Sequence, residues 1–189
     1  MLRHLPNLIT GLRILLVVPL CWLILDGRYD GALLIAAVAG LSDAVDGFLA
    51  KHFGWQSWIG GMLDPIADKL LLTATFVTLA MVGAIPAWLA IVVVGRDLVI
   101  VAGATAYHVL IGRFDASPSQ LSKWTTLVQI AFVLIELLRL SGWMPLAPPL
   151  HTALIAFTAA CTLASGLHYM VIWGNRARRA AQARGGSQP

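Results

Sequence analysis

Long apolar segments alternate with short polar gaps along almost the whole chain. Each segment is long enough for a membrane-spanning helix, which needs roughly 20 mostly apolar residues. The segments cover residues 8–26, 31–50, 61–83, 86–111, 119–140 and 149–173. Glycine, proline and polar residues fill the gaps, as in DGRYDG, GAIP and SGWMPLAPP. The pattern predicts an all-α polytopic membrane protein with six transmembrane helices. The stretch LPNLITGLR can lie along the membrane interface before the first span.

The composition agrees with this interpretation and argues against a soluble domain. Hydrophobic residues make up 59% of the 189 residues and charged residues only 12%, whereas soluble domains carry about 25% charged residues. The length suits one domain. We therefore expect a membrane domain over residues 1–175 and a basic, flexible tail over residues 176–189. Cys21 and Cys161 lie in apolar segments and are interpreted as packing residues.

Lysine and arginine are distributed unevenly over the predicted loops. One side would hold Arg3, Arg13, Lys51, Arg113, Lys123 and the arginines of RARRAAQAR, and the other side Arg28 and Arg139. The more positive side is normally cytoplasmic. We therefore predict an integral protein of the inner (cytoplasmic) membrane with both termini in the cytoplasm. A basic tail beside a membrane helix suits anionic lipid, so no nucleic acid partner is expected.

Four aspartates lie in the stretch SDAVDGFLAKHFGWQSWIGGMLDPIADK, where nearly all neighbours are apolar or small. Acidic residues inside a membrane are costly and usually mark a functional site. Asp43 and Asp46 are three positions apart, and Asp64 and Asp68 are four apart, so each pair shares one helix face. Because the two helices are consecutive and antiparallel, we expect them to be neighbours whose four carboxylates converge near the cytoplasmic surface.

Four carboxylates in one small volume repel each other unless a positive charge lies between them. Mg²⁺ is commonly held by carboxylates together with substrate phosphates, and two metal ions can stabilise both oxygens of a phosphoryl displacement. The sequence therefore predicts a site for two Mg²⁺ or Mn²⁺ ions. The alternative is that the aspartates form buried salt bridges with Lys51, Lys69 and Arg96, although such pairs contribute little stability.

The spacing of these residues resembles the signature of the CDP-alcohol phosphotransferase family. Family members carry D-x2-D-G-x2-A-R-x8-G-x3-D-x3-D, and the chain reproduces every spacing between residues 43 and 68. One position departs from the pattern, because Lys51 stands where the family has arginine. Lysine keeps the positive charge but loses the bidentate geometry of a guanidinium, which puts the strength of donor binding at this position in doubt.

The resemblance implies an enzyme that transfers a substituted phosphate from a CDP-linked donor to an alcohol and releases CMP. It implies a homodimer as well. Asp68 would act as the general base toward the acceptor hydroxyl. The implied metal ligands are Asp43, Asp46, Asp64 and Asp68, and the implied CDP contacts are Asp46, Gly47, Ala50, Lys51 and Gly60.

The acceptor is less clear from the sequence. LPNLITGLRILLVVPL and LDPIADKLLL resemble the phosphatidylglycerophosphate synthase and CMP-forming cardiolipin synthase branches of the family. We expect transfer from CDP-diacylglycerol to glycerol 3-phosphate, with phosphatidylglycerol as the alternative acceptor. Both acceptors carry phosphate, which favours arginine or lysine. The candidates are Arg96, Arg113 and Lys123, and Arg96 has the alternative role of balancing an aspartate of the predicted metal site.

Other charged residues have simpler interpretations. Glu136 and Arg139 are three positions apart and are expected to pair. Asp97 follows Arg96 and should point elsewhere on its helix. Lys69 follows Asp68, should likewise face away from it, and is expected to snorkel or pair. A protein of a different class, an ion-coupled transporter, could also use intramembrane acids. Transporter sites tend to lie at the midplane between repeated segments, and the chain shows neither feature.

Overall fold

The computed structural model describes the chain over residues 5–53, 58–110 and 119–185, and in these ranges every regular element is a helix. The side chains of residues 5–10, 13, 41, 43–53, 58–68, 104, 106–110 and 176–185 lie outside the description. The helices are α1 (Leu5–Leu25), α2 (Tyr29–Phe53), α3 (Trp58–Met81), α4 (Ala87–Leu110), α5 (Gln120–Leu140) and α6 (Pro148–Gly185). This confirms the all-α prediction.

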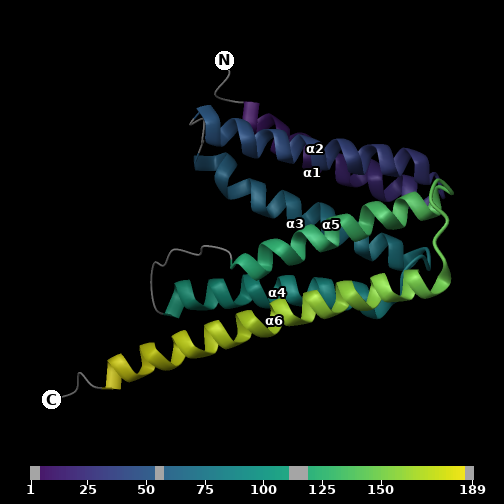
Figure 1. Cartoon of the computed structure of the whole chain (residues 1–189). Coiled ribbons are helices and arrows are strands. Elements are labelled where there is room, and N and C mark those ends of the chain that lie inside the picture. The colour runs from purple at the N-terminus through teal and green to yellow at the C-terminus, as the bar shows by residue number, and fades with distance from the viewer. Residues whose placement is uncertain (1–4, 54–57, 111–118, 186–189) are drawn as a thin grey trace.

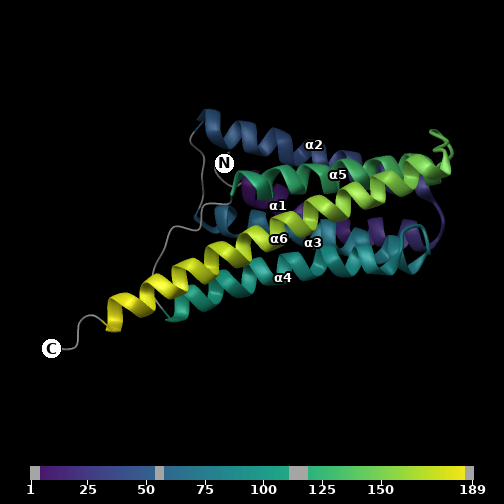
Figure 2. The ribbon, with the colours of Figure 1, turned by 60° about the horizontal axis from the view of Figure 1, so that its bottom comes forward.

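The helices form a bundle in which successive helices run in opposite directions (Figures 1 and 2). At one end lie the connections over residues 26–28, 82–86 and 141–147, and we call it the loop end. At the other end α2 finishes, α3 begins and the two termini lie, and we call it the motif end. Helix α6 continues past its predicted end at residue 173 to Gly185, since alanine and arginine favour helix. The boundary at residue 175 stays a prediction.

Helix α1 packs against both α2 and α3, and within the described residues α2 and α3 make no direct contact with each other. The expectation that these two helices are immediate neighbours is therefore wrong for this part of the chain. An apolar helix such as α1 can be covered on more than one side, and Leu20 and Ile24 of α1 are fully buried. The sequence order of α2 and α3 does not by itself reveal this insertion.

Glycines end three helices at the loop end. Gly27, Gly83 and Gly142 have φ values of 72°, 71° and 78°, a left-handed conformation that favours glycine. After α1, the backbone N–H of Arg28 donates to the carbonyl of Leu23 at 2.9 Å, which is the bond of a Schellman cap. The predicted gaps around residues 27, 83 and 142 are thus confirmed as tight turns.

The apolar core lies in the half of the bundle nearest the loop end. Phe76 of α3 stacks on Phe132 of α5 with ring centroids 5.7 Å apart. The buried apolar cluster around them contains Leu20, Ile24, Ala32, Phe76, Leu79, Ile85, Leu89, Ala90, Val93, Phe132, Val133, Leu137 and Ala159. The helices are therefore held together by apolar packing at the loop end, and by polar contacts closer to the motif end.

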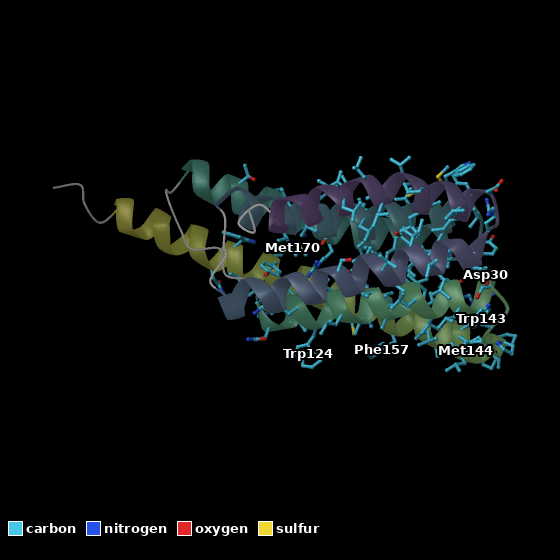
Figure 3. All side chains as sticks on the ribbon, turned by 90° about the horizontal axis from the view of Figure 1, so that it is seen from above. Asp30, Trp124, Trp143, Met144, Phe157 and Met170 are labelled. Atoms are coloured by element: carbon cyan, nitrogen blue, oxygen red, sulfur yellow. The ribbon has the colours of Figure 1, made fainter. Side chains whose placement is uncertain are left out.

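The surface of the bundle is strongly apolar, whereas several polar side chains are buried. Trp124 and Phe157 are exposed on the outside of the bundle, and Trp143 and Met144 are exposed at its loop end (Figure 3). Large exposed apolar surfaces of this kind indicate contact with a membrane or a partner. Among the described residues, α5 and the portion Pro148–Asn175 of α6 are long and apolar enough to cross a bilayer. These features indicate a membrane protein.

Candidate functional site

The structure places the aspartate motif on two helices that meet the same end of the bundle. Asp43 and Asp46 belong to α2, and Asp64 and Asp68 to α3. The helical backbone agrees with the expected shared face of each pair. The convergence of the four carboxylates stays a prediction. These predicted site residues lie outside the described side chains: Asp43, Asp46, Gly47, Ala50, Lys51, Gly60, Asp64 and Asp68. Arg113 lies outside the described residues altogether.

A cluster of charged side chains lies beside this motif, deeper in the bundle. The Asp97 carboxylate of α4 accepts a hydrogen bond from Lys69 Nζ of α3 at 2.9 Å. The same Oδ1 atom accepts from Arg96 Nη1 at 2.6 Å. Lys69 directly follows Asp68 in the sequence. The cluster therefore joins α4 to the part of α3 that carries the second aspartate pair.

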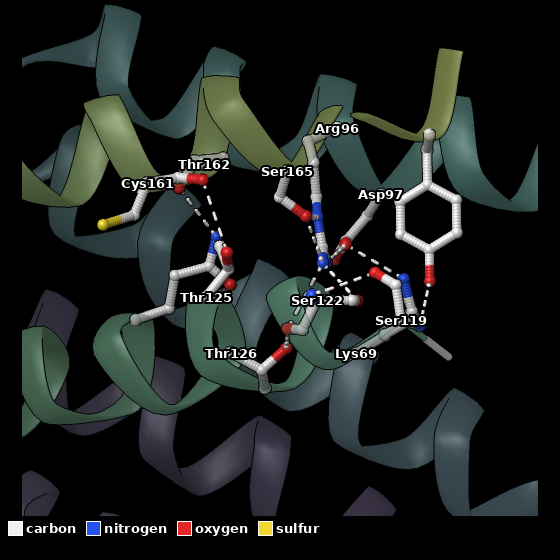
Figure 4. Close-up of polar contacts among 12 residues, drawn as sticks. Lys69, Arg96, Asp97, Ser119, Ser122, Thr125, Thr126, Cys161, Thr162 and Ser165 are labelled. Carbon is white, nitrogen blue, oxygen red and sulfur yellow. Dashed lines mark hydrogen bonds and ion pairs between the residues drawn. The ribbon is translucent and has the colours of Figure 1, made fainter. Parts of the chain in front are cut away.

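The guanidinium group of Arg96 also reaches α5 and α6 (Figure 4). Its Nη2 atom donates to Ser122 Oγ at 2.5 Å and to Ser165 Oγ at 3.1 Å. Its Nε atom lies 3.3 Å from the same Ser165 oxygen. Only 4% of the Arg96 side chain is exposed. Burial of a charged group is tolerated when its hydrogen bonds are satisfied in this way.

These contacts bear on the sequence predictions. The expectation that Asp97 points away from Arg96 is wrong, since Arg96 Nη1 binds the Asp97 carboxylate. Lys69 forms an ion pair with the same carboxylate, which is one of the two roles expected for it. The alternative role of Arg96, balancing an aspartate of the predicted metal site, stays a prediction, because the carboxylate that Arg96 binds among the described side chains is that of Asp97. Binding of acceptor phosphate by Arg96 stays a prediction, as it does for Lys123, which is exposed near the start of α5.

The start of α5 is fixed by contacts that the sequence pattern did not identify. Ser119 caps the helix, because its Oγ accepts from the backbone N–H of Ser122 at 3.2 Å. The backbone N–H of Ser119 donates to the hydroxyl of Tyr169 on α6 at 3.0 Å. A serine before an apolar segment is a recognisable capping signal. The tyrosine contact joins residues 50 positions apart and gives no local signal.

Further polar contacts join α5 and α6, and an ion pair lies within α5. Gln129 Nε2 donates to Thr162 Oγ1 at 3.0 Å, and both side chains are fully buried. Nearer the loop end, Arg139 binds Glu136 through Nε at 3.0 Å and Nη2 at 2.5 Å, which confirms the predicted pair. His151 Nε2 of α6 lies 3.0 Å from the second Glu136 oxygen. This charged group lies far from the aspartate motif, at the other end of the bundle.

A search of the described side chains finds no group of three or more His, Cys, Asp or Glu residues placed to hold a metal ion. The predicted metal ligands lie outside that search. Their chemistry nevertheless fits Mg²⁺ or Mn²⁺, which prefer carboxylate oxygen. Lys69 and Arg96, the two described cations of the neighbouring cluster, both have Asp97 as a carboxylate partner.

Comparison with known proteins connects the motif to a family. The CDP-alcohol phosphatidyltransferase family model matches residues 3–170. A probable phosphatidylglycerophosphate synthase of Mycobacterium tuberculosis (strain CDC 1551 / Oshkosh) is 32% identical over 180 residues, covering 89% of this chain and 81% of the relative. A CMP-forming cardiolipin synthase of Streptomyces coelicolor is 34% identical over 148 residues, covering 74% of this chain and 67% of the relative. A CMP-forming cardiolipin synthase of Homo sapiens is 30% identical over 181 residues, covering 87% of this chain and 60% of the relative.

The family match covers α1 to α5 completely and α6 as far as residue 170. It includes the aspartate motif and also the charged cluster of α3 and α4. The first relative aligns over most of its own length as well as most of this chain. The chain is therefore a member of the CDP-alcohol phosphatidyltransferase family.

Proposed function

We propose that this protein transfers the phosphatidyl group of CDP-diacylglycerol to glycerol 3-phosphate and releases CMP, as a phosphatidylglycerophosphate synthase. The observation that carries the proposal is the family match over residues 3–170, within which the complete aspartate motif occurs. The mycobacterial relative, named as a probable phosphatidylglycerophosphate synthase, supports this acceptor. Phosphatidylglycerol is the second candidate acceptor, favoured by the 34% identity to the Streptomyces cardiolipin synthase.

In the proposed reaction, the acceptor hydroxyl attacks the phosphorus of the phosphatidyl group. Asp68 takes the hydroxyl proton, and the bond from that phosphorus to the bridging oxygen breaks, so that CMP leaves with the bond's electrons. Asp43, Asp46 and Asp64 hold two Mg²⁺ or Mn²⁺ ions together with Asp68. Such ions, when bound, neutralise the diphosphate and stabilise the leaving CMP.

The donor is held by residues of the same motif. Gly47, Ala50 and Gly60 leave room for close approach of the CDP group, because small residues expose the backbone. Lys51 provides a positive charge for the diphosphate, without the two-pronged geometry of arginine. Lys123 is exposed and is a more accessible candidate for the acceptor phosphate than Arg96, which is buried among protein partners. Arg113 remains the third candidate.

The proposed membrane arrangement follows from the substrates. CDP-diacylglycerol has acyl chains that require the bilayer and a charged head that requires water. We propose that all six helices span the inner membrane, with the motif end and both termini in the cytoplasm. The excess of lysine and arginine at that end supports this orientation. The family resemblance further suggests a homodimer.

The test is CMP release by purified protein with CDP-diacylglycerol and Mg²⁺, with glycerol 3-phosphate and phosphatidylglycerol offered separately. Asp68→Asn keeps the size of the side chain but removes the base, so its CMP release should fall at least about a hundredfold. Release with glycerol 3-phosphate alone supports the first acceptor, and release with phosphatidylglycerol alone supports the second. No release with either acceptor would refute the proposed reaction.

A further inference from the structure

The charged cluster of Lys69, Arg96 and Asp97 has no role in the chemistry proposed above. The Asp97 side chain is 10% exposed. Its Oδ1 atom accepts hydrogen bonds from both cations, at 2.9 Å from Lys69 Nζ and 2.6 Å from Arg96 Nη1. Burying ion pairs contributes little to stability, because desolvation offsets the attraction. Arg96 and Asp97 are largely buried, whereas the Lys69 side chain is 36% exposed. A partly buried cluster of three charges therefore calls for a function besides stability.

The cluster connects four helices through a continuous set of hydrogen bonds (Figure 4). Lys69 belongs to α3, Arg96 and Asp97 to α4, Ser122 to α5 and Ser165 to α6. Arg96 donates to both serines while it holds Asp97, so its guanidinium cannot rotate without losing several bonds at once. Through Arg96, the Asp97 carboxylate is held in place against α5 and α6. The hydrogen bond from Lys69 to Asp97 then ties α3 to the same position.

The position of Lys69 determines what this anchoring does. In an α-helix each residue advances the axis by about 1.5 Å and the side-chain direction by about 100°. A contact that holds Lys69 thus also sets the height and rotation of the preceding turns of α3, which carry Asp64 and Asp68. The apolar core holds α3 farther along the helix, through the buried Phe76 and Leu79 and through the partly buried Leu71 and Leu72, which pack against the core.

We propose that Asp97 is a positioning residue that, through Lys69, fixes the rotation and height of α3 where it presents Asp64 and Asp68. Asp97 touches neither substrate nor metal in this role. The inference depends on the proposed function for its catalytic consequence. Its consequence for metal affinity depends only on the metal-binding role of the aspartates.

Two variants test the anchor. Lys69→Met keeps the length of the side chain and leaves Asp97 paired with Arg96, so folding should survive. Asp97→Asn keeps the shape of the side chain and removes its charge. Lys69→Arg restores a cation and serves as the conservative rescue. Glu136→Gln is the matched control, because it disrupts another buried ion pair at the loop end.

The measurements are Mn²⁺ affinity, from the electron paramagnetic resonance signal of free Mn²⁺, and kcat and KM for CMP release, all on purified protein in lipid nanodiscs. Loss of outer contacts around a metal site typically weakens affinity or activity about 10- to 100-fold. We expect about tenfold weaker Mn²⁺ binding and a comparable loss of kcat in Lys69→Met and Asp97→Asn. Lys69→Arg should recover most of both, and Glu136→Gln should stay within about twofold of wild type.

Several outcomes would overturn the inference. One is Mn²⁺ affinity and kcat within about twofold of wild type in folded Lys69→Met. Another is an equal loss in Glu136→Gln, which would mean a general effect of stability. If the proposed reaction is wrong but the proposed anchor is right, the measurements differ from these outcomes. If wild type binds Mn²⁺ and Lys69→Met weakens that binding, the anchor stands even when no CMP is released.

Discussion

Removing one or the other residue of the Glu136–Arg139 ion pair at the loop end should destabilise the protein by different amounts. Glu136 and Arg139 of α5 form two hydrogen bonds, at 3.0 and 2.5 Å, but their burial differs. The Glu136 side chain is 1% exposed and the Arg139 side chain 27% exposed. The residue that remains after a substitution therefore experiences a different environment in each case. Replacing either partner with leucine reveals the difference, because leucine adds no new polar group.

The expected magnitudes follow from that difference. Removing one partner of a buried pair costs about 3–5 kcal/mol. Arg139→Leu leaves the enclosed Glu136 carboxylate without its guanidinium partner, so a loss of about 3 kcal/mol is expected. Glu136→Leu leaves Arg139, which water can partly solvate, so about 2 kcal/mol is expected. The double variant should lose less than the sum, with a coupling energy of about 2–3 kcal/mol.

The assay is reversible unfolding by SDS in bicelles, followed by far-ultraviolet circular dichroism and tryptophan fluorescence. Both signals should change together if unfolding is a single transition. The reasoning about burial is refuted if Glu136→Leu destabilises the protein more than Arg139→Leu. A coupling energy below about 0.5 kcal/mol would also contradict it, since it would mean that the pair is as weak as an exposed one.

Substitutions at four further positions test the packing and capping of the helices by the same unfolding assay. At Gly103 of α4 an added Cβ would lie 2.8 Å from the Trp173 ring of α6, so Gly103→Ala should cost about 1–3 kcal/mol. Gly95→Ala, on the same helix with nothing within 4 Å of the added Cβ, should be neutral or stabilising by up to about 1 kcal/mol. Ser119→Ala should cost about 1 kcal/mol by loss of the α5 cap, and replacement by aspartate should restore it. Thr162→Val removes the hydroxyl that accepts from the buried Gln129 amide N–H and should cost about 1–3 kcal/mol. No change would mean that another group accepts this hydrogen bond.

Local features of the sequence determined the helices and turns. Apolar segments separated by glycine and proline gave the approximate bounds of α1 to α5, because helix formation depends mainly on nearby residues. Glycines at residues 27, 83 and 142 end helices in the conformation that only glycine adopts readily. The Glu136–Arg139 pair was predictable for the same reason, since a spacing of three on a helix fixes the distance between the side chains.

The sequence also determined the family, because the aspartate motif is short and its residues are close together along the chain. The family match over residues 3–170 confirmed that recognition. The extension of α6 to Gly185 was missed because the arginine-rich segment ends the apolar pattern without ending the helix. Hydropathy indicates where a membrane span stops, whereas helix propensity indicates where a helix stops.

Only the tertiary structure decided which helices contact each other. The insertion of α1 between α2 and α3 depends on how whole helix surfaces fit together, and consecutive order in the chain does not specify it. The contact of Arg96 with Ser165 joins residues 69 positions apart, and its pairing with Asp97 depends on a long side chain bending toward its neighbour. Such contacts arise from packing between helices, whereas sequence periodicity describes one helix at a time.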